Sequence, residues 1–377
     1  MGAAESISVL LAGGGSAGHV SPLLATADAL TRRHPEVRVA ALGTERGLEA
    51  RLVPARGIAL HVIPRVPMPR RPDTAALRFP AALRAAVAAA GAVIDETGAQ
   101  VVVGFGGYVS SPAYLAARRR GIPIVVHEGN ARPGFANRLG ARLTRHVATT
   151  FASTRLPHAQ CLGMPLRREI TTLDRAARRA EARAFFDLAP EATTLLVTGG
   201  SLGAQRLNES IAASARTLAA VGVQVVHIAG PGKQVTTPAV GDGGPSGGAE
   251  LPYRVLDYVD RMDLAYAAAD LVVCRAGANT VCELTAVGLP AAYVPLPIGN
   301  GEQRLNAAGV VAAGGGLLVD DAECTPAWVD GVLVPLVRDR DRLAAMSAAA
   351  AGVGRRDADE ALAALVERAA AGGEGAR

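Results

Sequence analysis

Four glycine-rich segments stand where a buried strand would give way to a helix, a position from which backbone N–H groups can approach an anion. They are Gly13–His19 (GGGSAGH), Gly104–Tyr108 (GFGGY), Gly199–Gly203 (GGSLG) and Arg275–Thr280 (RAGANT). Each alone is a weak signal, because tight strand-to-helix turns need glycine for steric reasons. None matches a Walker A pattern. Together they favour a nucleoside-diphosphate ligand over NAD binding or ATP hydrolysis.

Two titratable side chains, one in the first of these segments and one after the expected strand Ile124–His127, are candidates for proton transfer. His19 closes the first segment, and imidazole is the side chain most often used as a general base. Glu128, next to His127, is the competing base. Both have structural alternatives: His19 would cap its helix or orient the glycine loop, and Glu128 would bind a backbone amide or Asn130.

Short apolar runs alternate with alanine-rich segments of helical period, which is typical of doubly wound parallel sheets. The pattern starts twice, so we expect two such sheets. Expected strands of the first are Ile7–Ala12, Val37–Leu42, Val101–Gly104 and Ile124–His127, with helices at Pro22–Arg33, Leu77–Glu96 and Ala113–Arg120. Expected strands of the second are Thr194–Thr198, Val223–Ala229, Arg254–Leu256, Leu271–Cys274 and Ala291–Pro295.

A chain of 377 residues is longer than one core usually grows, so two domains are expected. We place the boundary at Gly163, giving domains 1–163 and 164–350. The tail 351–377 reads as a helix that either packs back on the first domain or extends the second. The Gly- and Pro-rich stretch Thr236–Glu250 is expected to be a mobile surface loop.

The net charge of +5 conceals an excess of Arg in the first half and of acidic residues in the second. A basic half attracts nucleic acid, nucleotides or an anionic membrane. Aromatic residues make up only 3%, and no nucleic-acid motif is present, so that class is not expected. Four scattered Cys indicate neither zinc nor disulfides, and fit a reducing cytoplasm. Neither a signal peptide nor a transmembrane helix is expected.

Six strings, in order and spacing, resemble the MurG family, the N-acetylglucosaminyltransferases that make lipid II in peptidoglycan synthesis. They are GGGSAGHVSPLLA (Gly13–Ala25), GFGGYVS (Gly104–Ser110), HEGNARPGFANR (His127–Arg138), TGGSLGAQRLN (Thr198–Asn208), CRAGANTVCE (Cys274–Glu283) and GNGEQRLNA (Gly299–Ala307). The resemblance covers nearly the whole chain. It implies an α/β fold of GT-B type, with two Rossmann-like doubly wound domains facing across a cleft.

The resemblance also implies where UDP-GlcNAc, the donor, would bind. Glu283 would hold the ribose hydroxyls, Val259 would lie beside the uracil, and Arg167 would pair with phosphate charge. The transferred sugar would meet Gln303, with Glu302 beside it. The diphosphate would meet backbone and hydroxyl groups of Ser201 and of five consecutive residues, namely Ala278, Asn279, Thr280, Val281 and Cys282.

The acceptor implied by the resemblance is lipid I, undecaprenyl-pyrophosphoryl-MurNAc-pentapeptide, whose muramyl C4 hydroxyl would displace UDP with inversion. His19 or Glu128 would take the proton. The first domain would close the site with Tyr108, for which packing is the alternative, and with Ser16, Ala17, Gly18 and Asn130. No paired acidic motif is placed to bridge a metal and a diphosphate, so neither a metal nor another cofactor is expected.

A membrane-binding segment is expected within Arg65–Arg84, where Arg alternates with Pro67, Met68, Leu77, Phe79 and Leu83. Arg118–Arg120 would add to it, and an ordinary amphipathic core helix is the alternative. The resemblance implies a peripheral enzyme on the cytoplasmic face of the membrane. It also implies roles in cell division and cell shape, with cell-wall or division complexes as further partners.

Some residues depart from the family pattern. Leu202 replaces a Gln, Ser16-Ala17 replaces a Thr-Gly pair, Gly129 replaces a frequent Gln, and Met164 replaces a small or polar residue. These departures leave two alternatives open. One is a paralogue that glycosylates a natural-product acceptor, and the other is a catalytically silent nucleotide-sugar-binding scaffold.

Overall fold

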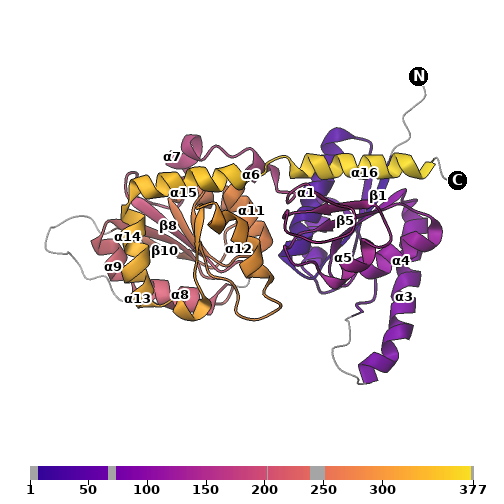
Figure 1. Cartoon of the computed structure of the whole chain (residues 1–377), viewed down its shortest axis with the longest axis horizontal. Helices are drawn as coiled ribbons and strands as arrows, with labels where there is room; N and C mark the ends of the chain where they lie inside the picture. Colours follow the sequence, from indigo (N-terminus) through magenta and orange to yellow (C-terminus); the bar gives the residue numbers. More distant parts are fainter. Residues whose placement is uncertain (1–6, 67–73, 202, 238–250, 375–377) are drawn as a thin grey trace. The chain divides into compact units, whose positions relative to one another are not determined.

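The structure is a computed structural model that describes residues 7–66, 74–201, 203–237 and 251–374. Leu202, most of the expected loop Thr236–Glu250 and part of the expected membrane segment, with Pro67 and Met68, lie outside the described residues. The chain divides into two compact units. The first comprises Met1–Arg167 and Asp357–Arg377, and the second comprises Arg168–Arg356 (Figure 1).

The described residues of the first unit contain a parallel sheet with strand order β3-β2-β1-β4-β5-β6-β7. Its strands are β1 (Ser8–Gly13), β2 (Arg38–Gly43), β3 (Ala59–Val62), β4 (Val101–Gly106), β5 (Ile124–Glu128), β6 (His146–Thr149) and β7 (Ala159–Cys161). Its helices are α1 (Ala17–Arg33), α2 (Glu49–Leu52), α3 (Thr74–Thr97), α4 (Ser110–Arg120), α5 (Phe135–Gly140) and α16 (Ala358–Glu374), with a 3-10 turn at Pro54–Arg56.

Helices cover both faces of this sheet, which explains why its central strands read as continuous apolar runs. In β1, Val9 and Leu11 pack toward the face covered by α1 and α16, while Leu10 and Ala12 pack toward α3 and α4. The last helix, α16, lies along α1 (Figure 1). There Arg32 pairs with Asp359 at 2.6 Å. Helix α16 therefore groups with the first unit, whose first stretch of chain ends at Arg167.

Helix α3 has two different halves. Its second half is a core helix, with one face buried against the sheet. Its first turns extend beyond the rest of the unit, and Leu77 is 83% exposed (Figure 1). Among the described residues, Leu77–Thr97 is the one segment with the length and composition to cross a membrane, although only 33% of it is buried and a core helix passes the same test. Arg120 is engaged in an ion pair with Asp95 of α3 at 2.6 Å.

The second unit repeats the arrangement, with strand order β10-β9-β8-β11-β12-β13 in the part that the structure describes. Its strands are β8 (Thr193–Thr198), β9 (Val223–Ile228), β10 (Tyr253–Leu256), β11 (Leu271–Cys274), β12 (Ala291–Tyr293) and β13 (Gly316–Leu318). Its helices are α6 (Arg168–Thr171), α7 (Arg175–Phe185), α8 (Gln205–Ala213), α9 (Ala215–Ala220), α10 (Met262–Ala268), α11 (Ala278–Ala286), α12 (Glu302–Ala312), α13 (Pro326–Trp328), α14 (Val334–Arg338) and α15 (Arg340–Val353), with a 3-10 turn at Asp321–Glu323 and a π-helical turn at Val329–Leu333.

The expected α/β class with two Rossmann-like sheets is confirmed, and each expected strand has a counterpart. Four short strands were not expected: β3, β6, β7 and β13. Helix α1 begins at Ala17 rather than at Pro22, because Ser16 is still extended (φ −139°, ψ 158°) and Pro22 is accommodated inside the helix. In each sheet the first strand of the unit lies centrally, and the strand order reverses beside it, between β1 and β4 and between β8 and β11. Such reversals are where doubly wound sheets bind ligands.

Candidate active site

The switch point of the first unit brings two of the four glycine segments together. Strands β1 and β4 are direct neighbours, with Gly13 paired with Gly106 at their carboxyl ends. The segment Gly13–Gly18 therefore lies beside Gly104–Tyr108. A Cβ built on Gly107 would lie 2.5 Å from the carbonyl oxygen of Gly14, so the two loops touch through backbone.

His19 lies in the first turn of α1 and is held by the glycine loop. Its Nδ1 is 3.0 Å from the carbonyl oxygen of Gly14 and 3.3 Å from Oγ of Ser16. A carbonyl oxygen only accepts, so Nδ1 carries the hydrogen and Nε2 carries the lone pair in the neutral ring. A Cβ on Gly106 would lie 3.0 Å from Nε2, which places that atom at the second loop. The half-buried ring is thus oriented by its loop while its other nitrogen remains suited to accepting a proton.

Glu128, the competing base, ends β5 and is only 3% exposed. Its Oε1 accepts from the N–H of Asn130 at 2.8 Å. Its Oε2 accepts from the N–H of Gly134 at 2.9 Å and from Nδ2 of Asn137 at 3.0 Å. This is the geometry of the structural alternative, in which the carboxylate shapes the loop that carries Asn130.

His127 and Asn137 are buried residues next to the loop that carries Asn130. His127 is fully buried, with Nε2 3.0 Å from the carbonyl oxygen of Gly163. Burial lowers the pKa of His127 to about 4, although the hydrogen bond with Gly163 opposes this, so the ring is neutral. Asn137 donates to the carbonyl of His127 at 3.0 Å and accepts from the Tyr114 hydroxyl at 2.8 Å.

The other residues expected in the first unit lie around these loops. Ser16 and Gly18 are exposed, and Ala17, Asn130 and Arg167 are half-buried. Tyr108 is 38% exposed, and the guanidinium of Arg65 lies 4.4 Å from its ring centre. Tyr108 is therefore a surface residue beside a cation rather than a core residue.

The second unit brings the other two glycine segments together in the same way, because β8 and β11 are neighbours. Ser201 is exposed on the first of them. A Cβ on Gly203 would lie 2.0 Å from the carbonyl oxygen of Ala229, so this glycine is required by close backbone packing. The second segment runs into α11, whose N-cap residue is Gly277 and whose first turn has no side-chain cap and no acidic residue. The N–H groups of a first helical turn have no intrahelical acceptor and favour an anion.

The five expected contact residues at the start of α11 differ in what they present. Ala278 is 7% exposed, and Asn279, Thr280 and Cys282 are half-buried. Val281 donates its N–H to the carbonyl of Gly277 at 3.0 Å, and its side chain is 2% exposed. Val281 therefore has no polar group directed away from the helix.

Glu283 lies one turn further along α11, and it is 9% exposed. Its Oε2 accepts from the hydroxyl of Tyr266 at 2.7 Å. Arg275, which precedes α11, is paired with Asp321 at 2.6 Å and donates to the carbonyls of Val294 and Pro295. The carboxylate of Glu283 is thus fixed by a buried tyrosine of α10.

Gln303 and Glu302 begin α12. Oε1 of Gln303 accepts from the N–H of Leu296 at 2.9 Å, which ties the loop before the helix to its first turn. Oε2 of Glu302 is buried and has no hydrogen-bond partner among the described residues. Val259 precedes α10, and its side chain is 8% exposed.

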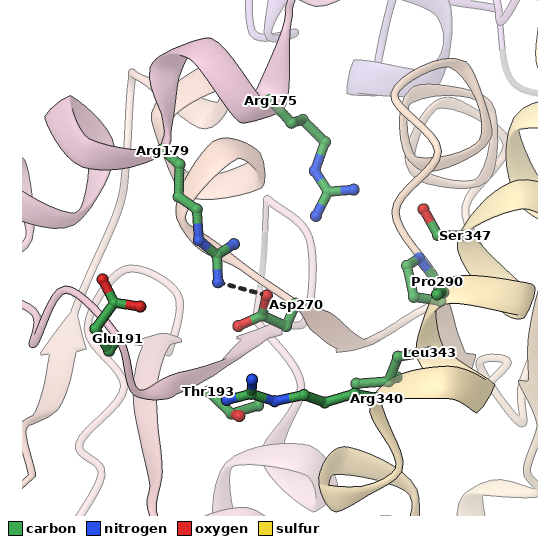
Figure 2. Close-up of a pocket in the computed structure, with 10 residues that line it drawn as sticks. Arg175, Arg179, Glu191, Thr193, Asp270, Pro290, Arg340, Leu343 and Ser347 are labelled. Atoms are coloured by element: carbon green, nitrogen blue, oxygen red, sulfur yellow. Dashed lines mark hydrogen bonds and ion pairs between the residues drawn. The ribbon is translucent and has the colours of Figure 1, made fainter.

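A cavity of about 320 Å³ lies elsewhere in this unit, at the amino ends of β8, β11 and β12 (Figure 2). Several of the charged side chains that line this cavity form ion pairs or hydrogen bonds within the protein. Arg179 pairs with Asp270 at 2.7 Å, and Arg175 donates to the carbonyls of Tyr266, Ala269 and Gly288. Burial lowers the pKa of Arg175 to about 10. This polar junction is at the end of the sheet opposite to the glycine loops.

The part of the chain described here contains no group of three or more His, Cys, Asp or Glu side chains placed to hold a metal ion. One buried carboxylate in the site was missed by sequence reasoning. Glu49 is fully buried, and its Oε2 accepts from the N–H of Gly15 at 2.8 Å. Nothing in the local sequence marks it, because the contact joins loops that are distant along the chain.

Two Rossmann-like sheets, each with paired glycine loops at its switch point, match the architecture of a glycosyltransferase of GT-B type. Comparison with known families agrees: the glycosyltransferase family 28 N-terminal domain matches residues 9–149, and its C-terminal domain matches residues 194–362. Two similar proteins, from Nocardioides sp. and Acidothermus cellulolyticus, are UDP-N-acetylglucosamine--N-acetylmuramyl-(pentapeptide) pyrophosphoryl-undecaprenol N-acetylglucosamine transferases. Both are 60% identical to this chain. The match with the Nocardioides protein covers 95% of this chain and 97% of that protein, and the match with the Acidothermus protein covers 96% and 98%.

A solved structure, that of Acinetobacter baumannii MurG, is 28% identical and superposes with a TM-score of 0.75 over 96% of this chain and 99% of that one. The calicheamicin glycosyltransferase CalG4, 19% identical with a TM-score of 0.63, shares the fold. The chain belongs to the MurG family of glycosyltransferases, as its six sequence strings predicted.

Proposed function

We propose that this enzyme transfers N-acetylglucosamine from UDP-GlcNAc to the muramyl C4 hydroxyl of lipid I, giving lipid II for peptidoglycan synthesis. The observation that supports the proposal is that the two switch points present different chemical groups. The first unit presents an oriented histidine, and the second presents an uncapped helix start beside a fixed carboxylate. Relatives that are 60% identical and carry this activity in their names support it.

In the proposal the donor binds the second unit. The N–H groups at the start of α11 and the hydroxyl of Ser201 receive the diphosphate, because an uncapped helix start favours negative charge. Glu283, held by Tyr266, accepts hydrogen bonds from the ribose hydroxyls. The buried Oε2 of Glu302 and the amide of Gln303 bind hydroxyls of the sugar. Val259 borders the uracil.

Transfer proceeds by a single displacement. Nε2 of His19 accepts the proton of the C4 hydroxyl as the oxygen bonds to the anomeric carbon. The bond from that carbon to the diphosphate oxygen breaks, UDP leaves with the electron pair, and the configuration inverts. Arg167 and the α11 N–H groups stabilise the developing charge. Glu128 shapes the loop that carries Asn130, because its oxygens already accept three hydrogen bonds.

A second candidate function is the same donor chemistry on a natural-product acceptor. It is favoured by one observation: the two departures Gly129 and Met164 are neighbours, because a Cβ added at position 129 would lie 3.3 Å from Cε of Met164. The change lies next to Asn130, on the side of the proposed acceptor. Offering purified enzyme lipid I and a soluble aglycone in competition separates the two functions.

The proposal places the enzyme peripherally on the cytoplasmic face of the cell membrane, near the machinery of growth and division. Support comes from the first turns of α3, where exposed Leu77 is followed by exposed Arg78 and Arg84. Apolar side chains beside Arg suit shallow insertion among anionic headgroups. Leu77→Glu should reduce cosedimentation with phosphatidylglycerol vesicles several-fold, whereas Val332→Glu, at an exposed position of the second unit, should not. Equal binding by both variants would remove α3 from the proposal.

The decisive assay is transfer of radiolabelled N-acetylglucosamine to a lipid I analogue. We expect product from the wild type and losses of roughly 100-fold or more for His19→Ala and Glu283→Ala. His34→Ala, at the other end of α1, is the matched control and should stay near wild type. Binding of UDP-GlcNAc without transfer to any acceptor would leave the silent scaffold. Transfer to the aglycone but not to lipid I would establish the second candidate.

A further inference from the structure

Glu49 is a fully buried carboxylate beneath the first glycine loop. Besides the N–H of Gly15, it accepts from the N–H of Thr44 at 3.0 Å and from the Thr44 hydroxyl at 2.8 Å, both through Oε1. Burial alone raises the pKa of Glu49, but these bonds and one from its own N–H outweigh it, and the net shift is downward. The group is therefore ionised at neutral pH, and it forms no ion pair within the described residues.

Glycines allow the carboxylate to occupy this place. A Cβ would fall 2.3 Å from Oε1 of Glu49 at Gly14, 2.5 Å from its Cγ at Gly43 and 2.0 Å from its Oε2 at Gly47. The loop glycine at position 14 is thus required by a protein carboxylate. Three glycines therefore leave the space that the Glu49 side chain fills beneath the loop.

One peptide unit joins this carboxylate to His19. The N–H of Gly15, bound by Glu49, and the carbonyl of Gly14, bound by Nδ1 of His19, belong to the same peptide group. The contacts run from Glu49 Oε2 to the N–H, across the amide, and from the carbonyl oxygen to Nδ1–H. An anion bound to an amide N–H increases the negative charge on its carbonyl oxygen, and hydrogen bonds in such chains strengthen one another.

We propose that Glu49 is a positioning residue for His19, acting through the Gly14–Gly15 peptide to fix the ring tautomer and to stabilise the protonated ring. The proposal rests on the proposed role of His19 as the base. When Nε2 takes the proton of the acceptor hydroxyl, the imidazolium donates more strongly to the Gly14 carbonyl. The fixed charge of Glu49 stabilises that state without moving.

Few other charged groups of the first unit face the His19 ring. Helix α1 packs against β1, β4 and α16. Neither strand carries a titratable side chain. Asp359, Glu360 and Glu367 of α16 pair with Arg32, Arg33 and His34 at the far end of α1. Asn137 lies near Gly106, and its side-chain amide donates to Glu128. The guanidinium of Arg65 lies over the ring of Tyr108. Glu49 is the anion connected to Nδ1 through the peptide.

The first test uses the wild-type chain and follows the ¹⁵N and ¹H shifts of the Gly15 amide with pH. His19 among the seven histidines is assigned by loss of its signals in His19→Ala. We expect the Gly15 amide to titrate with the same midpoint as the His19 ring, and this response to vanish in His19→Ala. A Gly15 amide that ignores the titration of His19 would overturn the proposal.

The second test compares Glu49→Gln with Thr44→Val, which removes a hydrogen bond to the other carboxylate oxygen. In Glu49→Gln the titration midpoint of His19 should move down by about half a pH unit or more. The acidic limb of the kcat profile should follow it, and kcat should fall roughly 10- to 100-fold with little change in donor KM. Thr44→Val should lower the melting temperature and leave the midpoint in place.

The outcomes separate this inference from the proposed function. An unmoved midpoint in folded Glu49→Gln, or a midpoint that moves equally in Thr44→Val, refutes the role of Glu49 even if His19→Ala is inactive. Full activity of His19→Ala refutes the base assignment, while the coupling between Glu49 and His19 is still read from the wild-type titration.

Discussion

The glycine loops at the two switch points look alike in sequence and differ in what occupies them. In the first unit the loop N–H of Gly15 is already bound by a buried carboxylate. In the second, the segment at Gly277 leads into a helix start without a side-chain cap, and a Cβ on Gly277 would meet nothing closer than Thr280 Oγ1 at 4.0 Å. The first loop is therefore contacted by a protein carboxylate at Gly14 and Gly15, whereas the segment at Gly277 has open space beside it.

The difference teaches that a glycine-rich turn after a strand does not by itself identify a phosphate site. A fixed carboxylate under the loop opposes a phosphate there and suits a group that becomes positive, the role proposed for His19. A bare helix start suits a group that becomes more negative, such as a departing diphosphate. The two halves of a displacement reaction thus match the two kinds of loop.

The strongest test of this difference between the loops is a Gly→Ala substitution in each of them. Gly14→Ala places a methyl group 2.3 Å from a clamped carboxylate, so the loop or Glu49 must shift. We expect a loss of stability of roughly 2 kcal/mol and of activity of about 100-fold, because small displacements of a catalytic group are costly. Gly277→Ala should leave stability within about 0.5 kcal/mol and raise the donor KM several-fold.

Thermal unfolding and steady-state kinetics with varied UDP-GlcNAc measure both variants. Each substitution is the control for the other. If Gly277→Ala unfolds the protein as readily as Gly14→Ala, the second loop is also packed from within and the comparison fails.

This contrast shows what the sequence could and could not predict. The central strands were predictable because burial on both faces makes them continuous apolar runs, as in β1, β4 and β8. Edge strand β3 was not, since its residues are half-buried or exposed. The positions of the glycine loops after their strands, and of His19 at the end of the first loop, could be predicted, and the roles proposed for them stay predictions. The role of Glu49 could not be predicted, because it depends on a contact with Gly15, which is 34 residues away along the chain.

The two units also share a feature, a buried histidine near their glycine loops. Each has a buried histidine below its loops, His127 in the first and His227 in the second, and burial lowers the pKa of each to about 4 from an ordinary value of 6.5. His227 contacts Asn208, which donates to the Ala229 carbonyl beside Gly203. The unfolded chain therefore takes up protons at a pH where the folded chain does not.

Stability should be fully present above about pH 6.5 and should fall as the pH drops toward 4, by up to roughly 3 kcal/mol for each histidine. Calorimetry from pH 7 to 4.5 measures this loss. His127→Gln and His227→Gln should each flatten the dependence, while His158→Asn, at an exposed position, keeps the wild-type slope. If only one of the two substitutions flattens the pH dependence of stability, the buried histidines of the two units do not have equivalent roles.

A smaller effect is expected where the first unit departs from the family pattern. Met164 is 2% exposed, and it fills the space that a side chain at Gly129 would need. Gly129→Gln alone should cost about 1–2 kcal/mol by overpacking, and Met164→Ala alone should cost about 2 kcal/mol by leaving a cavity. The double variant should recover at least about 1 kcal/mol of the summed loss. Urea unfolding of the four proteins measures the coupling, and additive losses would mean that the two departures are unrelated.

The mildest test concerns the open loop of the second unit. Tyr266 is 1% exposed, so it reaches a ligand only through Glu283, to which it donates at 2.7 Å. Tyr266→Phe keeps the packing and removes that bond, which should loosen Glu283 and raise the donor KM about 5-fold with kcat within about 2-fold. Glu283→Gln in the same assay shows what loss of the carboxylate itself does. A Tyr266→Phe enzyme with unchanged donor KM would mean that Glu283 is held by other contacts, whereas a fall in kcat would connect this carboxylate to the chemistry rather than to donor binding.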